Sequence, residues 1–118
     1  MPEEGKLYDT KTLIQIHQAD TEFVKYMISL FIKNIPEVNA HLEKACDEEN
    51  WKKVYFYAHK LKASIDLFNL EELKNPIRII EQKAKNQTET DAISKDVNFI
   101  SNYIKKCIAA MKKEFDFE

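Results

Sequence analysis

The chain has 118 residues, of which 44% are hydrophobic and 32% charged, a composition typical of one globular domain rather than a disordered chain. Its formal net charge is −2 and it has no cluster of Lys and Arg, which argues against nucleic-acid binding. It also lacks an apolar run of about 18 residues and a signal peptide, so we expect no membrane contact and a cytoplasmic location.

Few turn-forming residues interrupt the chain, which contains one Gly and three Pro. Residues 1–6 are predicted to be a frayed tail, followed by a short helix with Asp9 or Thr10 as its N-cap. A long helix then begins after Asp20, where Pro36 is expected to kink the helix or divide it in two. The apolar residues of this long helix recur at near-heptad steps: Val24, Met27, Phe31, Ile35, Val38, Leu42 and Ala45.

A central helix is predicted from Trp51 to Phe68, after a polar loop in which Asn50 is a good N-cap. Apolar residues recur along this helix at steps of 3, 4, 3, 4 and 3: Trp51, Val54, Ala58, Leu61, Ile65 and Phe68. This spacing makes one apolar seam. At about 100° per residue the seam is centred away from His59, which is therefore expected on the open face of the helix.

Two further helices are predicted after Asn69, and a polar connection over residues 85–91 separates them. The first contains Pro76, where we expect a local bend, and its apolar stripe is Leu70, Leu73, Ile77, Ile80 and Ala84. The stripe of the second is Ile93, Val97, Ile100, Ile104, Cys107 and Met111, with Phe115 and Phe117 in its tail. The chain is thus predicted to be one all-α domain over residues 1–118, an antiparallel up-down-up-down four-helix bundle with a short additional N-terminal helix.

The residues best suited to chemistry lie in the central helix. A neutral imidazole at His59 has a nitrogen lone pair that can accept a phosphoryl group. The ammonium group of Lys62, three residues later, lies on the same flank and can reach phosphoryl oxygens. The face opposite the seam carries an apolar patch that a purely solvated face would not need: Phe56, Ala63 and Leu67.

The string AHKLKAS at residues 58–64 resembles the signature of histidine-containing phosphotransfer (HPt) domains, His-x-Leu-Lys-Gly-Ser. The matching residues are His59, Leu61, Lys62 and Ser64. Ala63 stands where the family usually has Gly, a departure that affects the prediction of partner choice more than that of activity. The resemblance extends from residues 7–9 to the acidic helix that follows the motif.

This resemblance implies a phosphohistidine carrier, not an enzyme in its own right, that shuttles a phosphoryl group between receiver-domain aspartates in a two-component phosphorelay. His59 would be the acceptor, Lys62 would offset phosphoryl charge, and the apolar patch would dock the receiver. The family often has a residue on the next helix that hydrogen-bonds the imidazole, and both Glu81 and Gln82 fall near this position. The implied partners are response-regulator receiver domains or a hybrid sensor kinase, met by a monomer. No cofactor is expected on this chain, because the receiver would supply the Mg²⁺.

Two rival functions belong to other classes. A non-phosphorylated interaction module would dock a receiver or kinase through the same patch, and a purely structural bundle would bind neither. A carboxylate-bridged metal pair requires Glu-x-x-His, but the residues three positions before the histidines are Ile14, Val38 and Phe56. No metal site is therefore predicted. The histidines outside the motif, His17 and His41, are expected at the surface, and the cysteines, Cys46 and Cys107, as buried free thiols.

Overall fold

The computed structural model describes residues 7–10 and 21–115. It contains the helices α2 (Thr21–Asp47), α3 (Trp51–Leu67), α4 (Glu71–Asn86) and α5 (Ile93–Glu114), with a short 3-10 helix, η1 (Thr90–Ala92). These residues include no strand, and the predicted all-helical fold is confirmed. The predicted tail, the short N-terminal helix after Asp9 or Thr10, the Asp20 cap, His17 and Phe117 fall wholly or partly outside the described residues.

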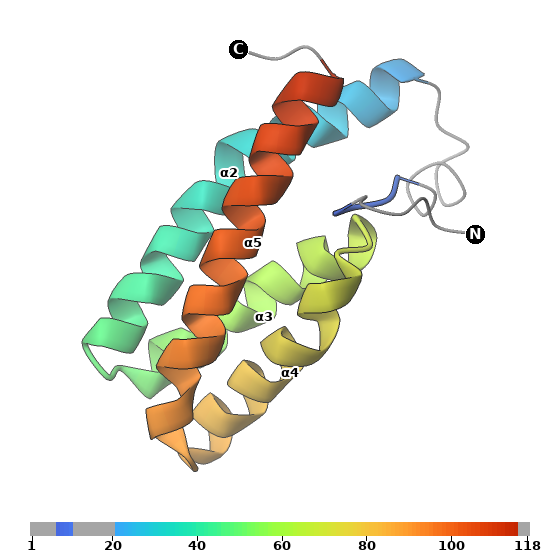
Figure 1. Ribbon diagram of the computed structural model, residues 1–118. Helices are drawn as coiled ribbons and strands as arrows, with labels where there is room; N and C mark the ends of the chain where they lie inside the picture. The colour runs from blue at the N-terminus through green and yellow to red at the C-terminus, as the bar shows by residue number, and fades with distance from the viewer. Residues whose placement is uncertain (1–6, 11–20, 116–118) are drawn as a thin grey trace.

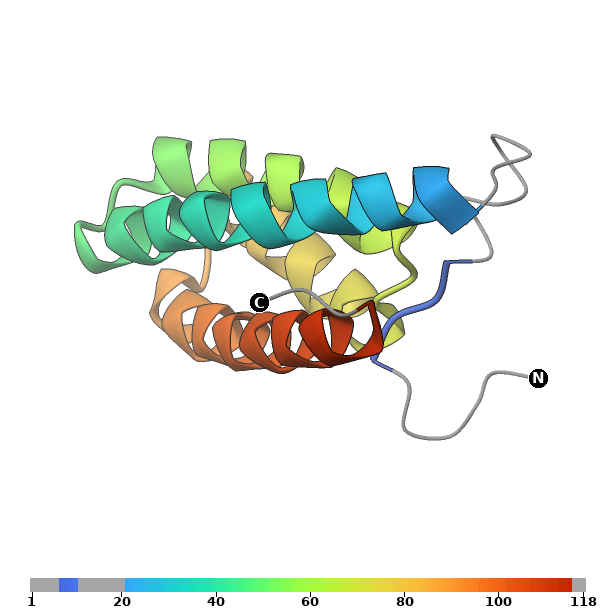
Figure 2. The same cartoon turned by 90° about the horizontal axis from the view of Figure 1, so that it is seen from above.

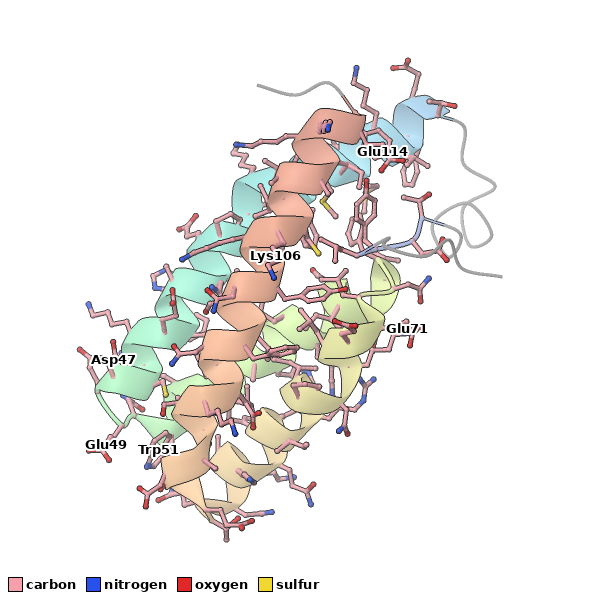
Figure 3. The ribbon with its side chains drawn as sticks, in the orientation of Figure 1. Asp47, Glu49, Trp51, Glu71, Lys106 and Glu114 are labelled. Atoms are coloured by element: carbon pink, nitrogen blue, oxygen red, sulfur yellow. The ribbon has the colours of Figure 1, made fainter. Side chains whose placement is uncertain are left out.

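The four long helices pack as a closed ring around one core. In Figures 1 and 2 they lie side by side, with short connections at the ends of the bundle. Helix α3 packs against α2 and α4, and α5 packs against the same two helices. Figure 3 shows Asp47 and Trp51 at the end where α2 turns into α3, and Glu114 at the other end. No described helix has a stretch both long and apolar enough to cross a bilayer.

The predicted apolar stripes form most of the core. Every predicted residue of the α4 and α5 stripes is buried, and in the central seam only Trp51 remains partly exposed. Helix α2 differs, because Met27 and Val38 are only half-buried while Ile28 and Asn39 are buried. The buried stripe of α2 is therefore broader than the single heptad seam that the sequence predicts.

Local signals explain where the helices begin and end. The Asn50 side chain accepts a hydrogen bond from the Lys53 backbone N–H at 3.2 Å, as predicted for the N-cap of α3. The turn after α3 places Asn69 at a positive φ of 52°, which ends the helix. Helix α4 extends beyond the predicted boundary at residue 85, because Gln87 adopts a left-handed conformation and its N–H bonds to the Lys83 carbonyl.

Of the two alternatives predicted at Pro36, division of the helix is wrong, since α2 is one helix from Thr21 to Asp47, and a kink stays a prediction. A proline removes one intrahelical hydrogen bond, but packing of the flanking buried residues Ile35 and Leu42 favours a continuous helix. A buried polar contact also joins this helix to α5, where the Asn39 amide donates to Ser101 Oγ at 3.0 Å.

Residues 7–10 lie across one end of the bundle. The Asp9 N–H donates to the Phe68 carbonyl at 2.8 Å, and the Tyr103 hydroxyl donates to the Leu7 carbonyl at 2.8 Å. Tyr8 is buried and bonds through its hydroxyl to the Glu114 carboxylate. Both cysteines, Cys46 and Cys107, are buried free thiols as predicted, and burial raises the pKa of Cys107 to about 12.

Candidate functional site

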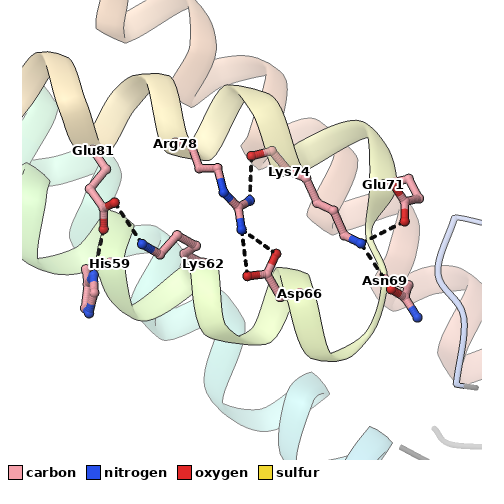
Figure 4. Close-up of polar contacts among 8 residues, drawn as sticks. All are labelled: His59, Lys62, Asp66, Asn69, Glu71, Lys74, Arg78 and Glu81. Atoms are coloured by element: carbon pink, nitrogen blue, oxygen red, sulfur yellow. Dashed lines mark hydrogen bonds and ion pairs between the residues drawn. The ribbon is translucent and has the colours of Figure 1, made fainter. Parts of the chain in front are cut away.

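His59 lies on the outer face of α3, and 61% of its side chain is exposed. Its Nδ1 atom lies 2.6 Å from Oε2 of Glu81, which extends from α4 (Figure 4). The site is thus built by two adjacent, closely packed helices. The helical phase that buries Ala58 and Leu61 holds the imidazole outside the core, while α4 supplies a carboxylate beside it.

Glu81 bridges two side chains of α3. Its Oε1 atom accepts a hydrogen bond from Lys62 Nζ at 2.9 Å, while Oε2 contacts His59 (Figure 4). Only 15% of the Glu81 side chain is exposed, against 27% for Lys62. Burial favours the neutral acid, but the hydrogen bonds from Lys62 and His59 outweigh burial and lower the pKa of Glu81.

The ionised state of Glu81 determines the tautomer of the imidazole. A carboxylate with a lowered pKa only accepts hydrogen bonds at neutral pH, so Nδ1 of His59 must carry the hydrogen and donate it. The other ring nitrogen, Nε2, is then left with its lone pair. This lone pair lies on the far side of the ring from Glu81, at the exposed face of the helix.

Of the two residues that the sequence left open as imidazole partners, Glu81 is the one that contacts the ring. Gln82 is exposed and lines a groove between α3 and α4 instead. Glu81 directly follows the buried Ile80, so it lies at the edge of the core stripe of α4. The next residue is rotated by about a further 100°, which turns its side chain outward.

One aromatic ring of α3 stacks on His59, and three other rings contact one another on α2 and α3. The Tyr55 ring stacks with the imidazole at a centroid distance of 6.2 Å, and the His41 ring stacks on Tyr57 at 5.1 Å. Phe56 is 52% exposed and contacts Tyr57 edge-to-face at 5.1 Å. The His41 side chain is half exposed, in agreement with its predicted surface position, but its stacking partner was not predicted.

Two of the three residues predicted to form the apolar patch, Phe56 and Ala63, are exposed. The third, Leu67, is half-buried and packs against the core, and its place in the docking patch stays a prediction. Leu67 is the last residue of α3, so the turn that leads into α4 lies beside it. The exposed apolar surface around the imidazole is therefore smaller than the sequence indicates.

A family model described as the Hpt domain matches residues 27–114, which include most of α2 and all of α3, α4 and α5. The chain belongs to the Hpt domain family. The resemblance read from the sequence is thereby confirmed, and HPt domains are phosphocarrier modules of phosphorelays that interact with receiver domains or kinases. Searches of curated proteins and of solved structures give no match to this chain.

A second ion pair fastens the two helices that build the site of this HPt domain. Arg78 Nη2 lies 2.9 and 3.1 Å from the two carboxylate oxygens of Asp66, and its Nη1 donates to the Lys74 carbonyl (Figure 4). One guanidinium nitrogen thus contacts both carboxylate oxygens, about one turn from Glu81 along α4. The sequence did not predict this pair, because no motif joins residues of two different helices.

Of the other motif residues, Leu61 is fully buried in the core and Ser64 is half-buried. Leu61 therefore helps to pack α3 against its neighbours. Within residues 7–10 and 21–115, no three His, Cys, Asp or Glu side chains converge in a group that would hold a metal ion. The described site offers an oriented imidazole, a carboxylate and an ammonium group.

Proposed function

We propose that the protein is a phosphohistidine carrier that shuttles a phosphoryl group between receiver-domain aspartates, with His59 as the acceptor. One observation carries this proposal: Nδ1 of His59 is held by a carboxylate, which leaves Nε2 exposed as a nucleophile. The proposal takes the fold as the up-down-up-down antiparallel bundle predicted from the sequence. The short connections and the views in Figures 1 and 2 support that order.

The proposed transfer is a single displacement at phosphorus. The Nε2 lone pair attacks the phosphorus of an aspartyl phosphate, and an N–P bond forms while the P–O bond to the aspartate breaks. The aspartate leaves as a carboxylate with the bonding electron pair. The ring keeps its Nδ1 proton and gains positive charge, which the Glu81 carboxylate stabilises at 2.6 Å. The reverse step returns the phosphoryl group to a second receiver.

Glu81 and Lys62 have different roles in this proposal. Glu81 is a positioning residue, since it holds the tautomer in which Nε2 is the nucleophile. Lys62 Nζ is engaged by Glu81 before transfer, and its flexible side chain lies on the same flank of α3 as His59. It is therefore placed to exchange the carboxylate for a phosphoryl oxygen when His59 is phosphorylated.

The receiver is proposed to approach over the exposed Phe56 and Ala63, which lie about one turn on either side of His59. A long side chain at position 63 would obstruct this approach, whereas alanine leaves the imidazole accessible. The Mg²⁺ that assists transfer is proposed to belong to the receiver. The monomeric state and the cytoplasmic location stay predictions.

The test is phosphoryl transfer from a phosphorylated receiver, chosen as the fastest donor in a profile of the receivers of the source organism. We expect the protein to gain an acid-labile phosphate with a ³¹P resonance typical of a phosphohistidine. His59→Gln should abolish this gain, while the matched variant His41→Gln should retain it. Receiver binding without phosphate uptake would instead identify a non-phosphorylated interaction module, and uptake by His59→Gln would refute the assignment.

A further inference from the structure

Helices α3 and α4 are joined by a ladder of charged side chains that starts beside the imidazole and runs away from it. Along α3 the charged groups are those of Lys62 and then Asp66, and along α4 they are those of Glu81 and then Arg78 (Figure 4). The signs alternate along each helix and are opposite across the interface. Lys62 therefore pairs with Glu81 at 2.9 Å, and Arg78 pairs with Asp66 at 2.9 and 3.1 Å.

Lys62 has two carboxylates within the reach of its side chain. Glu81 is the one that it contacts, and Asp66 is the other, because it lies four residues later on the same helix. Side chains four positions apart are neighbours on a helix surface, with Cβ atoms about 5–6 Å apart, so a lysine and an aspartate at this spacing can pair. An Asp66 carboxylate without a counter-charge would therefore compete with Glu81 for the ammonium group.

Arg78 engages this competitor. One of its guanidinium nitrogens contacts both carboxylate oxygens of Asp66, and another donates to the Lys74 carbonyl at 2.9 Å, which holds the guanidinium against its own helix. The next cation along α4 does not share this task, because Lys74 Nζ bonds to Glu71 and to Asn69. The contact that occupies Asp66 across this interface is therefore that of Arg78.

The position of the Lys62 ammonium group matters at two stages of the proposed transfer. Before transfer it bonds to Glu81, whose side chain is only 15% exposed, and after transfer it is placed to bind a phosphoryl oxygen. A pair between Lys62 and Asp66 would weaken both contacts. The Asp66 side chain is 41% exposed, so solvent screens its charge and the competition would reduce these contacts without abolishing them.

We propose that Arg78 is a positioning residue of the phosphotransfer site: by binding Asp66, it keeps Lys62 available to Glu81 and then to the phosphoryl group. The inference rests on the proposed phosphocarrier function and adds to it a residue that acts through other side chains. If the pair of Arg78 and Asp66 only stabilised the bundle, loss of either partner would have the same effect. In the proposed role only the loss of Arg78 is harmful, and removal of Asp66 as well restores the site.

The test compares wild type with Arg78→Met, Asp66→Asn and the double variant that carries both changes. Each protein is phosphorylated with phosphoramidate, which transfers its phosphoryl group to an imidazole and releases ammonia without needing a docking surface. We expect Arg78→Met to shorten the lifetime of the phosphohistidine about two- to fivefold, as for competition between partly exposed charges. Asp66→Asn and the double variant should keep the wild-type lifetime, and so should the matched control Lys74→Met.

The double variant lacks the same ion pair as Arg78→Met, so its restored lifetime cannot come from a more stable fold. A second control removes the ammonium group itself. In a Lys62→Met background, Arg78→Met should change the lifetime no further, because no ammonium group is left to divert. Denaturant unfolding of each variant reports stability separately from the lifetime.

A readout that needs no phosphate separates this inference from the proposed function. Titration of the Glu81 carboxyl by NMR reports whether Lys62 stays beside it, since the hydrogen bond from Lys62 lowers the pKa of Glu81. Arg78→Met should raise this pKa, and the double variant should restore it. Absence of phosphate uptake by wild type would remove the phosphocarrier function, and the titration would still decide whether Arg78 governs the Lys62 contact.

Three results would overturn the positioning role. They are a wild-type lifetime in Arg78→Met, a lifetime in the double variant as short as in Arg78→Met, and a further loss on adding Arg78→Met to Lys62→Met. The second and third results would mean that the guanidinium acts on the phosphoryl group directly or through the stability of the bundle.

Discussion

Replacing Glu81 by alanine tests the contacts that Glu81 makes with His59 and Lys62. The variant removes the acceptor of Nδ1 of His59 and the partner of Lys62 in one step. Nδ1 would then exchange hydrogen bonds with water, and the two neutral tautomers of the imidazole would both be populated. Part of the population would present a protonated Nε2, which cannot attack phosphorus. Glu81→Gln is the matched variant, because its amide oxygen can still accept from Nδ1 although it carries no charge.

The expected magnitudes follow from the exposure of the three side chains. A hydrogen bond to a charged group contributes about 1.5–3 kcal/mol when well shielded from water. His59 is 61% exposed and Lys62 27%, so solvent screens both contacts and the lower end of this range applies. We expect Glu81→Ala to lower the free energy of unfolding by about 1 kcal/mol and to slow transfer about tenfold, equivalent to about 1.4 kcal/mol of activation free energy. The unfolding free energy and the transfer rate of Glu81→Gln should both lie between those of Glu81→Ala and wild type.

Three measurements check this reasoning. The ¹⁵N shifts of the His59 ring report the tautomer, and we expect wild type to show hydrogen on Nδ1 and Glu81→Ala to show a mixture. Single-turnover transfer from the receiver reports the rate, and denaturant unfolding reports stability. A wild-type ring spectrum together with a wild-type transfer rate in Glu81→Ala would refute the positioning role.

The pH dependence of stability provides an independent check on Glu81. Its pKa is lowered in the folded protein, so its ionic contacts stabilise the fold above its ordinary value of 4.5. This stabilisation is lost as the pH falls below 4.5 and through the lower folded-state pKa. The difference in unfolding free energy between wild type and Glu81→Gln should therefore be largest near neutral pH and shrink in acid. An unchanged difference across this range would mean that Glu81 does not carry the charge.

The remaining predictions concern single residues of α3. His59→Gln should abolish phosphate uptake while leaving the helical circular dichroism unchanged, since the side chain lies outside the core. Lys62→Ala should shorten the lifetime of the phosphohistidine, because about 1–3 kcal/mol of charge-assisted hydrogen bonding is lost. An unchanged lifetime and transfer rate would show that Lys62 is a solvated side chain without a role in transfer. Ala63→Arg should alter stability by only about 0.5 kcal/mol, because the position is exposed, yet block the receiver and slow transfer steeply. A wild-type transfer rate in Ala63→Arg would place docking elsewhere.

Helical periodicity predicted most of the core. In α4 and α5 one stripe of apolar residues at steps of three and four faces the interior, and each predicted member is buried. The same rule was less accurate for α2, where Asn39 is buried although it is polar. Its amide donates a hydrogen bond to the Ser101 hydroxyl in α5, 62 positions further along the chain. A sequence shows a buried polar residue only as an interruption of the pattern, because its partner becomes visible when the helices pack.

The motif predicted the acceptor but not the network around it. His59 and Lys62 are three residues apart on one helix, so their common flank follows from the helical period. The contact between Arg78 and Asp66 involves two helices, and its geometry depends on how α3 and α4 are aligned. Leu67 shows the opposite effect: its phase on an ideal helix faces away from the seam, but the turn after α3 buries it partly.

The choice between Glu81 and Gln82 shows what determines such a network. The buried stripe sets the phase of α4, and at about 100° per residue Glu81 lies at the edge of the core side while Gln82 lies nearly opposite. Phase alone therefore favours Glu81, but Lys83 lies at the other edge of the same stripe. The handedness of the bundle decides which of these two edges faces α3. The spacing of apolar residues is the same in a left-turning and a right-turning bundle, so it cannot make this choice. In this bundle the Glu81 edge meets α3, which places a carboxylate rather than an ammonium group against the imidazole.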